Sequence, residues 1–321
     1  MEAEVARAVA AWEPDYVEAF GLDILPLLAA AGTRTRRVWT ASDDWCVHHL
    51  TRARSARTWR EGVSAVRAAI LMLAYERSFA RSIDAAVAVS GLDRWGLRHL
   101  GGIRRVMLSP CGVDAKYFHP VASQPRRASA VFWGRLDYEP NIEAVCWFAR
   151  HVWPRLISQH RGARWRIIGR APDARVRDLA RDHEGIDLHA NVDDLRPLVW
   201  DSAAVVIPMR SGSGVKNKLL EATAMGRAVV VSPRAERGLA DRERPWCVAR
   251  SADDWVRDVD RLWCDAGYAR RLGDAAHRWA LAHHEWERNA IQREDYFGAG
   301  RGAVARDVEA EQDQTIRRAA A

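Results

Sequence analysis

The residues with the clearest potential for chemistry are Lys218 and Glu221, which stand three positions apart. On a helix this spacing places both side chains on one face. Directly upstream, Ser211-Gly212-Ser213-Gly214 lets the backbone turn sharply and approach a ligand closely. A glycine turn that leads into a helix offers free N–H groups and a positive dipole end. The pattern predicts a nucleotide-diphosphate site, in which the ammonium meets the phosphates and the carboxylate meets ribose hydroxyls.

The elements around this pair are predicted to be a strand, a turn, a helix and a second strand. Residues 203–207 form a continuous apolar run, which is typical of a parallel strand covered on both faces. Residues 215–225 have helical composition, and Gly226 is placed to end that helix. The alternative is a surface Lys–Glu pair worth about 0.2–0.5 kcal/mol. The flanking glycines and apolar strands favour the ligand site over this alternative.

Four segments, taken in order, resemble the family 4 glycosyltransferases, which have the GT-B fold. They are Cys-Gly-Val-Asp through Phe-His-Pro at 111–120, Val-Phe-Trp-Gly-Arg-Leu-Asp-Tyr-Glu-Pro-Asn at 131–141, Trp-Arg-Ile-Ile-Gly at 165–169, and Gly-Ser-Gly-Val-Lys-Asn-Lys-Leu-Leu-Glu-Ala with Met-Gly-Arg-Ala-Val-Val at 212–230. The resemblance extends from about residue 39 to 297. It is closest to the exopolysaccharide-type sugar transferases of that family.

The resemblance and the alternation of strands with helices predict an α/β, GT-B-like protein with two Rossmann-like doubly wound domains. The predicted parts are a partial N-terminal, acceptor-side domain (1–118), a linker (119–128), a nucleotide-sugar domain (129–284), a crossover helix (285–297) and a disordered tail (298–321). The predicted strands lie near 15–19, 36–40, 85–89, 104–108, 129–133, 164–168, 186–190, 203–207, 227–232 and 246–249. The first strand and glycine loop of a complete GT-B enzyme have no counterpart here, so the N-terminal domain is predicted to be incomplete.

The resemblance also implies roles for individual residues. Arg135 and Lys218 would stabilise the departing diphosphate, and Asp43 is a catalytic candidate on the acceptor side. Donor-binding groups would be Glu221, Gly134, Gly212, Ser213, Gly214, Val215 and Val192, the last through its backbone beside the base. Two positions depart from the family pattern: Ser213 replaces a glutamate found eight residues before Glu221 in many members, and Asn141 replaces a frequent lysine.

The expected activity is a metal-independent, retaining glycosyltransferase of the hexosyltransferase type, without a cofactor. It would move a sugar from a nucleotide-diphosphate sugar to a glycan or lipid-linked acceptor in surface or exopolysaccharide synthesis. The alternative is a truncated, catalytically weak homologue that acts as a nucleotide-sugar-binding or partner module. A nucleic-acid partner is not expected, because the arginines are spread along the chain without a basic-aromatic module.

Composition gives weaker guidance. The chain has 321 residues, a formal charge of +7 and a pI near 9.5, a balance that suits anionic lipids or donors but also a GC-rich genome. No apolar run reaches the roughly 18 residues of a membrane span. Five scattered cysteines without Cys-x-x-Cys spacing favour a reduced, cytoplasmic protein without a zinc site. Peripheral association with the inner face of the plasma membrane stays open.

Overall fold

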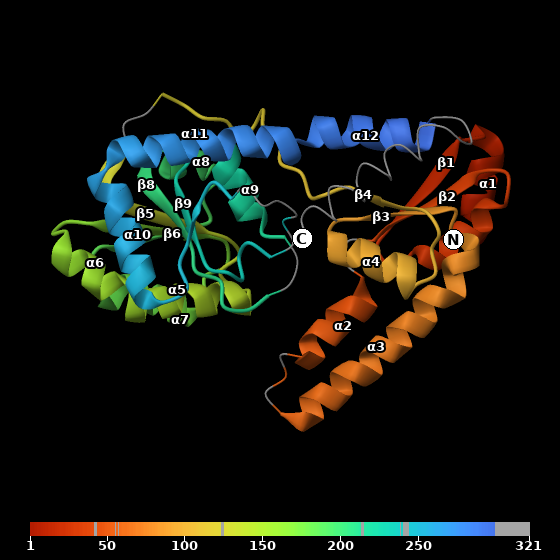
Figure 1. The fold of residues 1–321 in the computed structure, drawn as a ribbon, viewed down its shortest axis with the longest axis horizontal. Helices are drawn as coiled ribbons and strands as arrows, with labels where there is room; N and C mark the ends of the chain where they lie inside the picture. The colour runs from red at the N-terminus through yellow and green to blue at the C-terminus, as the bar shows by residue number, and fades with distance from the viewer. Residues whose placement is uncertain are drawn as a thin grey trace. The chain divides into compact units, whose positions relative to one another are not determined.

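The computed structural model describes residues 1–41, 44–54, 56, 58–122, 125–212, 215–237, 239 and 244–298. The chain divides into two compact units (Figure 1). Unit 1 contains residues 1–110 and the segment that starts at Glu287, and unit 2 contains residues 111–237 and the segment that ends at Trp286. Each unit is built on a parallel β-sheet with helices, as the sequence predicted.

The sheet of unit 1 has four parallel strands in the order β1-β2-β3-β4. They are β1 (Tyr16–Phe20), β2 (Arg36–Ala41), β3 (Ala85–Ala88) and β4 (Val106–Leu108). Successive residues of a strand point to opposite faces, and a separate apolar cluster covers each face. One cluster contains Trp39 and Leu97, and the other contains Val38 together with Tyr296 and Phe297 of α12 (Trp286–Gly298). The last helix therefore packs on the sheet of unit 1.

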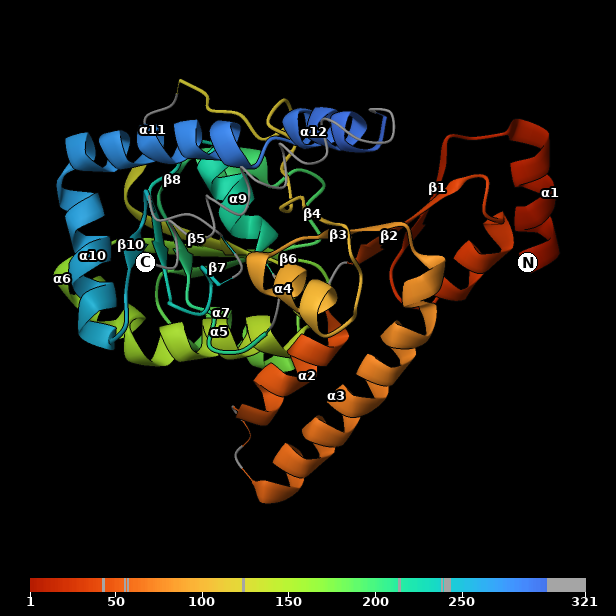
Figure 2. The ribbon, with the colours of Figure 1, turned by 45° about the vertical axis from the view of Figure 1, so that its right-hand side comes forward.

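The helices of unit 1 are α1 (Glu2–Trp12), α2 (Trp45–Arg54), α3 (Trp59–Phe79) and α4 (Gly91–His99), with short 3₁₀ turns η1 (Leu25–Ala31) and η2 (Ala80–Ser82). The composition of residues 22–30 favours an α-helix, but η1 forms 3₁₀ turns instead, with a proline in its first turn and no side-chain cap. Helices α2 and α3 form a hairpin, and they run side by side in both views (Figures 1 and 2).

The sheet of unit 2 has six parallel strands in the order β10-β9-β8-β5-β6-β7. They are β5 (Arg126–Trp133), β6 (Arg164–Gly169), β7 (Ile186–Ala190), β8 (Ser202–Ile207), β9 (Val229–Val231) and β10 (Cys247–Val248). The chain adds β6 and β7 on one side of β5, and β8 to β10 on the other. Chain direction across the sheet therefore reverses between β5 and β8, where ligands of open α/β sheets bind at the carboxyl ends of the strands.

Strand β5 begins three residues earlier than predicted, inside the segment expected to be linker. Arg126 pairs with Ser202 of β8, and its N–H donates to Asp201 O at 3.0 Å. The register shifts before Ala130, and Ala128 has a φ of 50°. Local composition predicted a linker here, because it does not show the pairing of this segment with β8. That strand lies about 75 residues further along the chain.

The helices of unit 2 are α5 (Glu139–His151), α6 (Trp153–Gln159), α7 (Ala174–Asp182), α8 (Arg196–Trp200), α9 (Asn217–Ala224), α10 (Ala252–Cys264) and α11 (Ala266–His283). Aromatic side chains fill much of the core. The ring centroid of Trp165 lies 4.7 Å from that of Phe148 and 5.9 Å from that of Trp153, and all three side chains are fully buried. These tryptophans are core residues.

Candidate functional site

Helix α9 carries the predicted Lys–Glu pair and follows β8 directly. It begins at Asn217, two residues later than expected, and ends at Ala224. Gly226 has a φ of 65° and donates its N–H to Thr223 O, while Arg227 N–H donates to Ala222 O. This pair of bonds is a Schellman motif, in which glycine takes the left-handed position without a Cβ penalty. The prediction that Gly226 ends the helix is confirmed.

Lys218 and Glu221 both face the end of β5. The indole Nε1 of Trp133 donates to Oε2 of Glu221 at 2.6 Å. The Lys218 ammonium donates to Oδ1 of Asn141 at 2.7 Å and lies 4.0 Å from the ring centroid of Phe132. Among the described contacts, no direct Lys218–Glu221 ion pair occurs. The two charges are instead held separately by neighbours from β5 and α5, which is not the arrangement of an ordinary surface pair.

Burial shifts the titration of both groups away from their usual values. Loss of solvation lowers the pKa of Lys218 to about 7, with Glu221 opposing the shift and Lys216 adding to it. Burial also raises the pKa of Glu221, although the Trp133 hydrogen bond and the Lys218 charge act in the opposite direction. An anion beside Lys218 would favour its charged form. The site is therefore prepared for a negatively charged ligand next to Nζ.

Two glycines allow these groups to come together. A Cβ on Gly134 would lie 2.8 Å from Nδ2 of Asn141 and 3.0 Å from Nζ of Lys218. A Cβ on Gly169 would lie 1.9 Å from the carbonyl oxygen of Gly134. The ends of β5 and β6 thus approach more closely than any other residue type permits. The same close approach brings backbone atoms of Gly134 next to the lysine.

Arg135 lies in the same loop, but its side chain is engaged elsewhere. Its guanidinium forms a fork with Asp137, at 3.0 Å and 2.8 Å, and 76% of the side chain is exposed. This contact holds the pKa of the Asp137 carboxyl below its usual range. The Arg135 carbonyl accepts from Nδ2 of Asn141 at 2.8 Å. The backbone of Arg135 therefore belongs to the site, whereas its guanidinium does not touch Lys218 or Glu221.

The remaining predicted donor residues lie on loops at the carboxyl ends of the strands. Val192 is two residues past the end of β7, where Asn191 N–H donates to Gly169 O at 2.9 Å. Gly212 has a φ of 95° and packs near Pro140 at the start of α5. Val215 stands two residues before α9. Ser213 and Gly214 lie outside the described residues, as does Asp43.

Two residues of the site were missed as partners by sequence reasoning, namely Trp133 and Asn141. Trp133 ends β5 and Asn141 lies in the first turn of α5, so they are 88 and 77 positions from the residues that they contact. A further contact joins the loop after β8 to α5, since Ser211 Oγ donates to Oε2 of Glu143 at 2.5 Å. The only local signal was a tryptophan directly before the Gly134 turn.

Unit 1 contains a separate group of buried carboxyls near the predicted acceptor side. Asp44 caps α2, because its Oδ1 accepts from Val47 N–H at 2.8 Å. Burial, with a contribution from Asp93, raises the pKa of Asp44 to about 6. Burial and the Asp44 charge raise the pKa of Glu76 to about 8. At pH 7 a pKa near 8 keeps the Glu76 carboxyl mostly protonated, whereas a pKa near 6 leaves Asp44 mostly ionised.

Comparison with known proteins identifies both the fold and one domain. Residues 127–265 match the family model described as glycosyl transferases group 1. Similar solved structures include sucrose-phosphate synthase from Thermosynechococcus elongatus (16% identity, TM-score 0.69, 92% of this chain and 76% of that one) and Anabaena HepE in complex with UDP and glucose (13%, 0.63, 93% and 81%). TarM is also similar (11%, 0.70), and the chain spans 58% of its length. No curated protein matches the sequence.

The fold is that of the GT-B glycosyltransferases. The segment that matches the group 1 glycosyl transferase model, residues 127–265, contains Trp133, Asn141, Lys218 and Glu221. The predicted GT-B fold is confirmed, and so is the predicted resemblance to glycosyltransferases.

Proposed function

We propose that the protein transfers a sugar from a nucleotide-diphosphate sugar to a glycan or lipid-linked acceptor in surface or exopolysaccharide synthesis, with retention of configuration. One observation carries this proposal: Lys218 and Glu221 converge on the end of β5 at the point where the strand order reverses. UDP-sugars are the first donors to test. HepE was solved with UDP and glucose, and a trehalose-6-phosphate synthase of E. coli with UDP-2-fluoro glucose.

The proposed chemistry follows from where charge develops. Cleavage of the anomeric C–O bond leaves its electron pair on the diphosphate and builds positive charge on the sugar ring. The acceptor oxygen attacks the anomeric carbon, and its proton passes to the departing phosphate oxygen on the same face. The Lys218 ammonium and the amino end of α9 would stabilise the negative charge on the diphosphate. Such a scheme needs no metal, and none of these steps requires a pair of carboxylates.

Glu221 would accept hydrogen bonds from the ribose hydroxyls. Its Oε2 is held by Trp133, so the carboxylate is oriented before the ligand arrives. The base would lie near the backbone of Val192, beyond the end of β7. Arg135 would join the site by exchanging Asp137 for a phosphate oxygen, which is feasible because an exposed ion pair is weak.

Calorimetry with UDP and a panel of nucleotide sugars tests the donor site, with the full chain as the protein. We expect saturable binding that Glu221→Gln weakens by about tenfold, the loss of roughly one charged hydrogen bond. Glu184→Gln, on an exposed loop before β7, is the matched control and should leave binding unchanged. Absence of binding to every nucleotide diphosphate would overturn the proposal. Binding without turnover on any glycan or lipid acceptor would favour the module alternative.

Metal independence is tested by measuring turnover after dialysis against a chelator. We expect unchanged rates, because fixed cations of the protein replace the metal at the leaving group. A rate that falls on chelation and returns with Mg²⁺ or Mn²⁺ would contradict this part of the proposal.

An exposed apolar face of α3 supports peripheral membrane association. Trp59, Val63, Val66 and Ile70 follow one another at intervals of four, three and four residues, and are 74%, 60%, 43% and 63% exposed. Residues 45–79 contain six arginines but only two glutamates, one of which, Glu76, is buried. A tryptophan-bearing apolar face within a basic segment matches an anionic lipid surface. No described helix is long and apolar enough to cross a bilayer.

We propose that this face of α3 brings the enzyme to a lipid-linked acceptor. Sedimentation with vesicles of phosphatidylcholine, with and without phosphatidylglycerol, tests it. Binding should require the anionic lipid and fall when Val63 and Ile70 are both changed to Glu. Leu92→Glu on α4, also exposed, is the control. Equal binding of all variants, or association of the chain with itself through this face, would overturn the proposal.

A further inference from the structure

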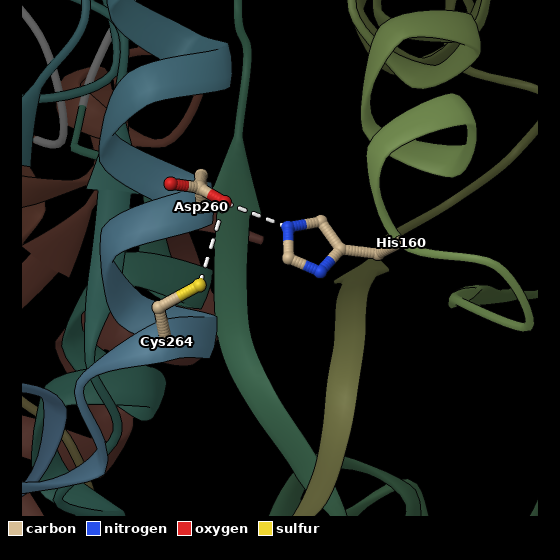
Figure 3. A group of neighbouring side chains, drawn as sticks. All are labelled: His160, Asp260 and Cys264. Atoms are coloured by element: carbon tan, nitrogen blue, oxygen red, sulfur yellow. Dashed lines mark hydrogen bonds and ion pairs between the residues drawn. The ribbon is translucent and has the colours of Figure 1, made fainter.

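Three side chains with metal-binding atoms converge in unit 2, away from the donor site (Figure 3). His160 follows α6, whereas Asp260 and Cys264 stand one turn apart on α10. In Figure 3 the three side chains point toward one another from these two elements. None of them has a role in the proposed glycosyl transfer. The pairing of an imidazole, a carboxylate and a thiol at one place is therefore unexplained by the donor site.

The distances suit a metal ion. Nε2 of His160 lies 2.7 Å from Oδ1 of Asp260, and Sγ of Cys264 lies 3.5 Å from the same oxygen. All three ligand atoms lie within 4.8 Å of one another. Around a tetrahedral zinc ion, nitrogen, oxygen and sulfur ligands are about 3.3–3.7 Å apart, as follows from the usual bond lengths. Side-chain adjustments of about 1 Å or less would therefore place the three atoms around one ion.

The surroundings hold the group in place while leaving it open to solvent. The His160 ring packs edge-on against Trp263, with centroids 5.2 Å apart. A second contact ties α6 to α10, since Arg155 NH1 lies 2.7 Å from Oδ1 of Asp253. Cys264 is exposed. An ion can thus enter from solvent and meet ligands whose backbones are already fixed by two packed helices.

We propose that His160, Asp260 and Cys264 form a zinc site with three protein ligands and an open fourth position for water. The mixture of nitrogen, oxygen and sulfur donors favours zinc over magnesium or calcium, which prefer oxygen ligands alone. The sequence was expected to hold no zinc site because no Cys-x-x-Cys motif occurs. The expectation missed this group because His160 is 100 positions from Asp260.

The proposed zinc site lies near the amino ends of the strands, whereas the donor site lies at their carboxyl ends. His160 precedes β6, whereas Trp133 and Gly169 end β5 and β6, and all the strands are parallel. The ion would therefore stabilise the structure, because it would join the loop before β6 to α10. Binding of zinc releases the thiol proton of Cys264 to solvent. Donor binding should not depend on the ion.

Metal titration of the chelator-treated full chain tests the proposal directly. We expect one Zn²⁺ per chain by calorimetry, and with Co²⁺ a thiolate-to-metal charge-transfer absorption. Cys264→Ser should remove that absorption and weaken zinc binding by about tenfold or more, the loss that even changes outside the ligand sphere cause. Cys146→Ser, on α5, is the control and should retain both. No stoichiometric binding, or an unchanged absorption in Cys264→Ser, would overturn the site.

A melting experiment separates the metal role of His160 from its packing role. His160→Gln loses contacts to Trp263 and Asp260 and lowers the melting temperature by itself. Each protein is therefore compared with itself, with and without Zn²⁺. The ion should raise the melting temperature of the unchanged chain and leave that of His160→Gln unaltered. An equal rise in both proteins would refute the proposed ligand set. UDP binding by Cys264→Ser, expected to be normal, keeps this test independent of the proposed function.

Discussion

The indole Nε1 of Trp133 donates a 2.6 Å hydrogen bond to Oε2 of Glu221, which joins the last residue of β5 to helix α9. The bond orients the carboxylate and leaves its other oxygen for a ligand. It also makes Glu221 a structural partner of a nearly buried tryptophan. Substitutions at Glu221 therefore have to be chosen so that binding and stability can be separated.

Glu221→Gln and Glu221→Ala should differ in stability but both lose affinity for UDP. Glutamine keeps an oxygen that can accept from Trp133, so its free energy of unfolding should stay within about 1 kcal/mol of the unchanged chain. Alanine leaves the indole N–H without its acceptor and should cost about 1–3 kcal/mol. Urea unfolding and UDP calorimetry measure the two effects. If Glu221→Gln binds UDP normally but unfolds more easily, the residue is structural.

Binding of a diphosphate should take up a proton through Lys218. Its pKa is lowered to about 7, so at pH 8 to 9 the free site holds the amine mostly neutral. A phosphate beside Nζ favours the ammonium, and up to about one proton should be absorbed per UDP bound. Calorimetry at pH 8.5 in two buffers of different ionisation enthalpy measures this uptake.

Lys218→Met should abolish that proton uptake, and Lys116→Met, outside the site, should not. The same pKa shift affects stability: between about pH 7 and 10.5 the folded chain binds fewer protons than the unfolded chain. Its free energy of unfolding therefore gains a favourable contribution as pH rises through that window, and Lys218→Met should lack it. Identical proton uptake in Lys218→Met would remove the lysine from the diphosphate site.

Arg135→Met should reduce turnover less than Lys218→Met does. The guanidinium must first leave Asp137, and its side chain is mostly exposed, whereas the ammonium already lies inside the site. Loss of one fixed donor at a developing charge lowers kcat by about 10²–10³-fold. We expect the loss of kcat in Arg135→Met to be smaller than this. Arg181→Met, another exposed arginine forked to an aspartate, is the control. Full activity of Arg135→Met would exclude the residue from leaving-group stabilisation.

Gly169→Ala should destabilise unit 2 and disturb the donor site together. The new Cβ would lie 1.9 Å from the Gly134 carbonyl oxygen, so the ends of β5 and β6 must separate. Overpacking of this kind costs about 1–3 kcal/mol. Gly91→Ala, whose Cβ meets nothing within 4 Å, is the matched control. Equal unfolding midpoints for the two variants would contradict the close approach of the strands.

The buried acids of unit 1 should make stability depend on pH. The pKa of Glu76 is raised to about 8 from 4.5, so between these values the folded chain binds more protons than the unfolded chain. The free energy of unfolding should then fall as pH rises from about 4.5 to 8, by at most about 4 kcal/mol. Glu76→Gln should flatten this decline in urea titrations. A decline of the same size in Glu76→Gln would assign it to other groups, such as Asp44.

Much of the fold followed from local pattern. The apolar run of β8, the stop at Gly226 and the common face of Lys218 and Glu221 are all decided within a few residues, by side-chain periodicity and by the conformations that glycine permits. The helix start at Asn217 and the 3₁₀ form of η1 were missed, because terminal turns depend on weak local energies that packing overrides.

The sequence by itself determined the elements and the chemistry-bearing residues of the chain: a strand, a glycine turn and a helix that presents one cation and one acid. The tertiary structure alone decided which partners those charges have. Trp133 and Asn141 reach α9 only because the parallel sheet places β5 beside β8, and His160 reaches Asp260 only because α6 packs near α10. Contacts between residues 77 to 100 positions apart are fixed by strand order and packing, which no local pattern encodes.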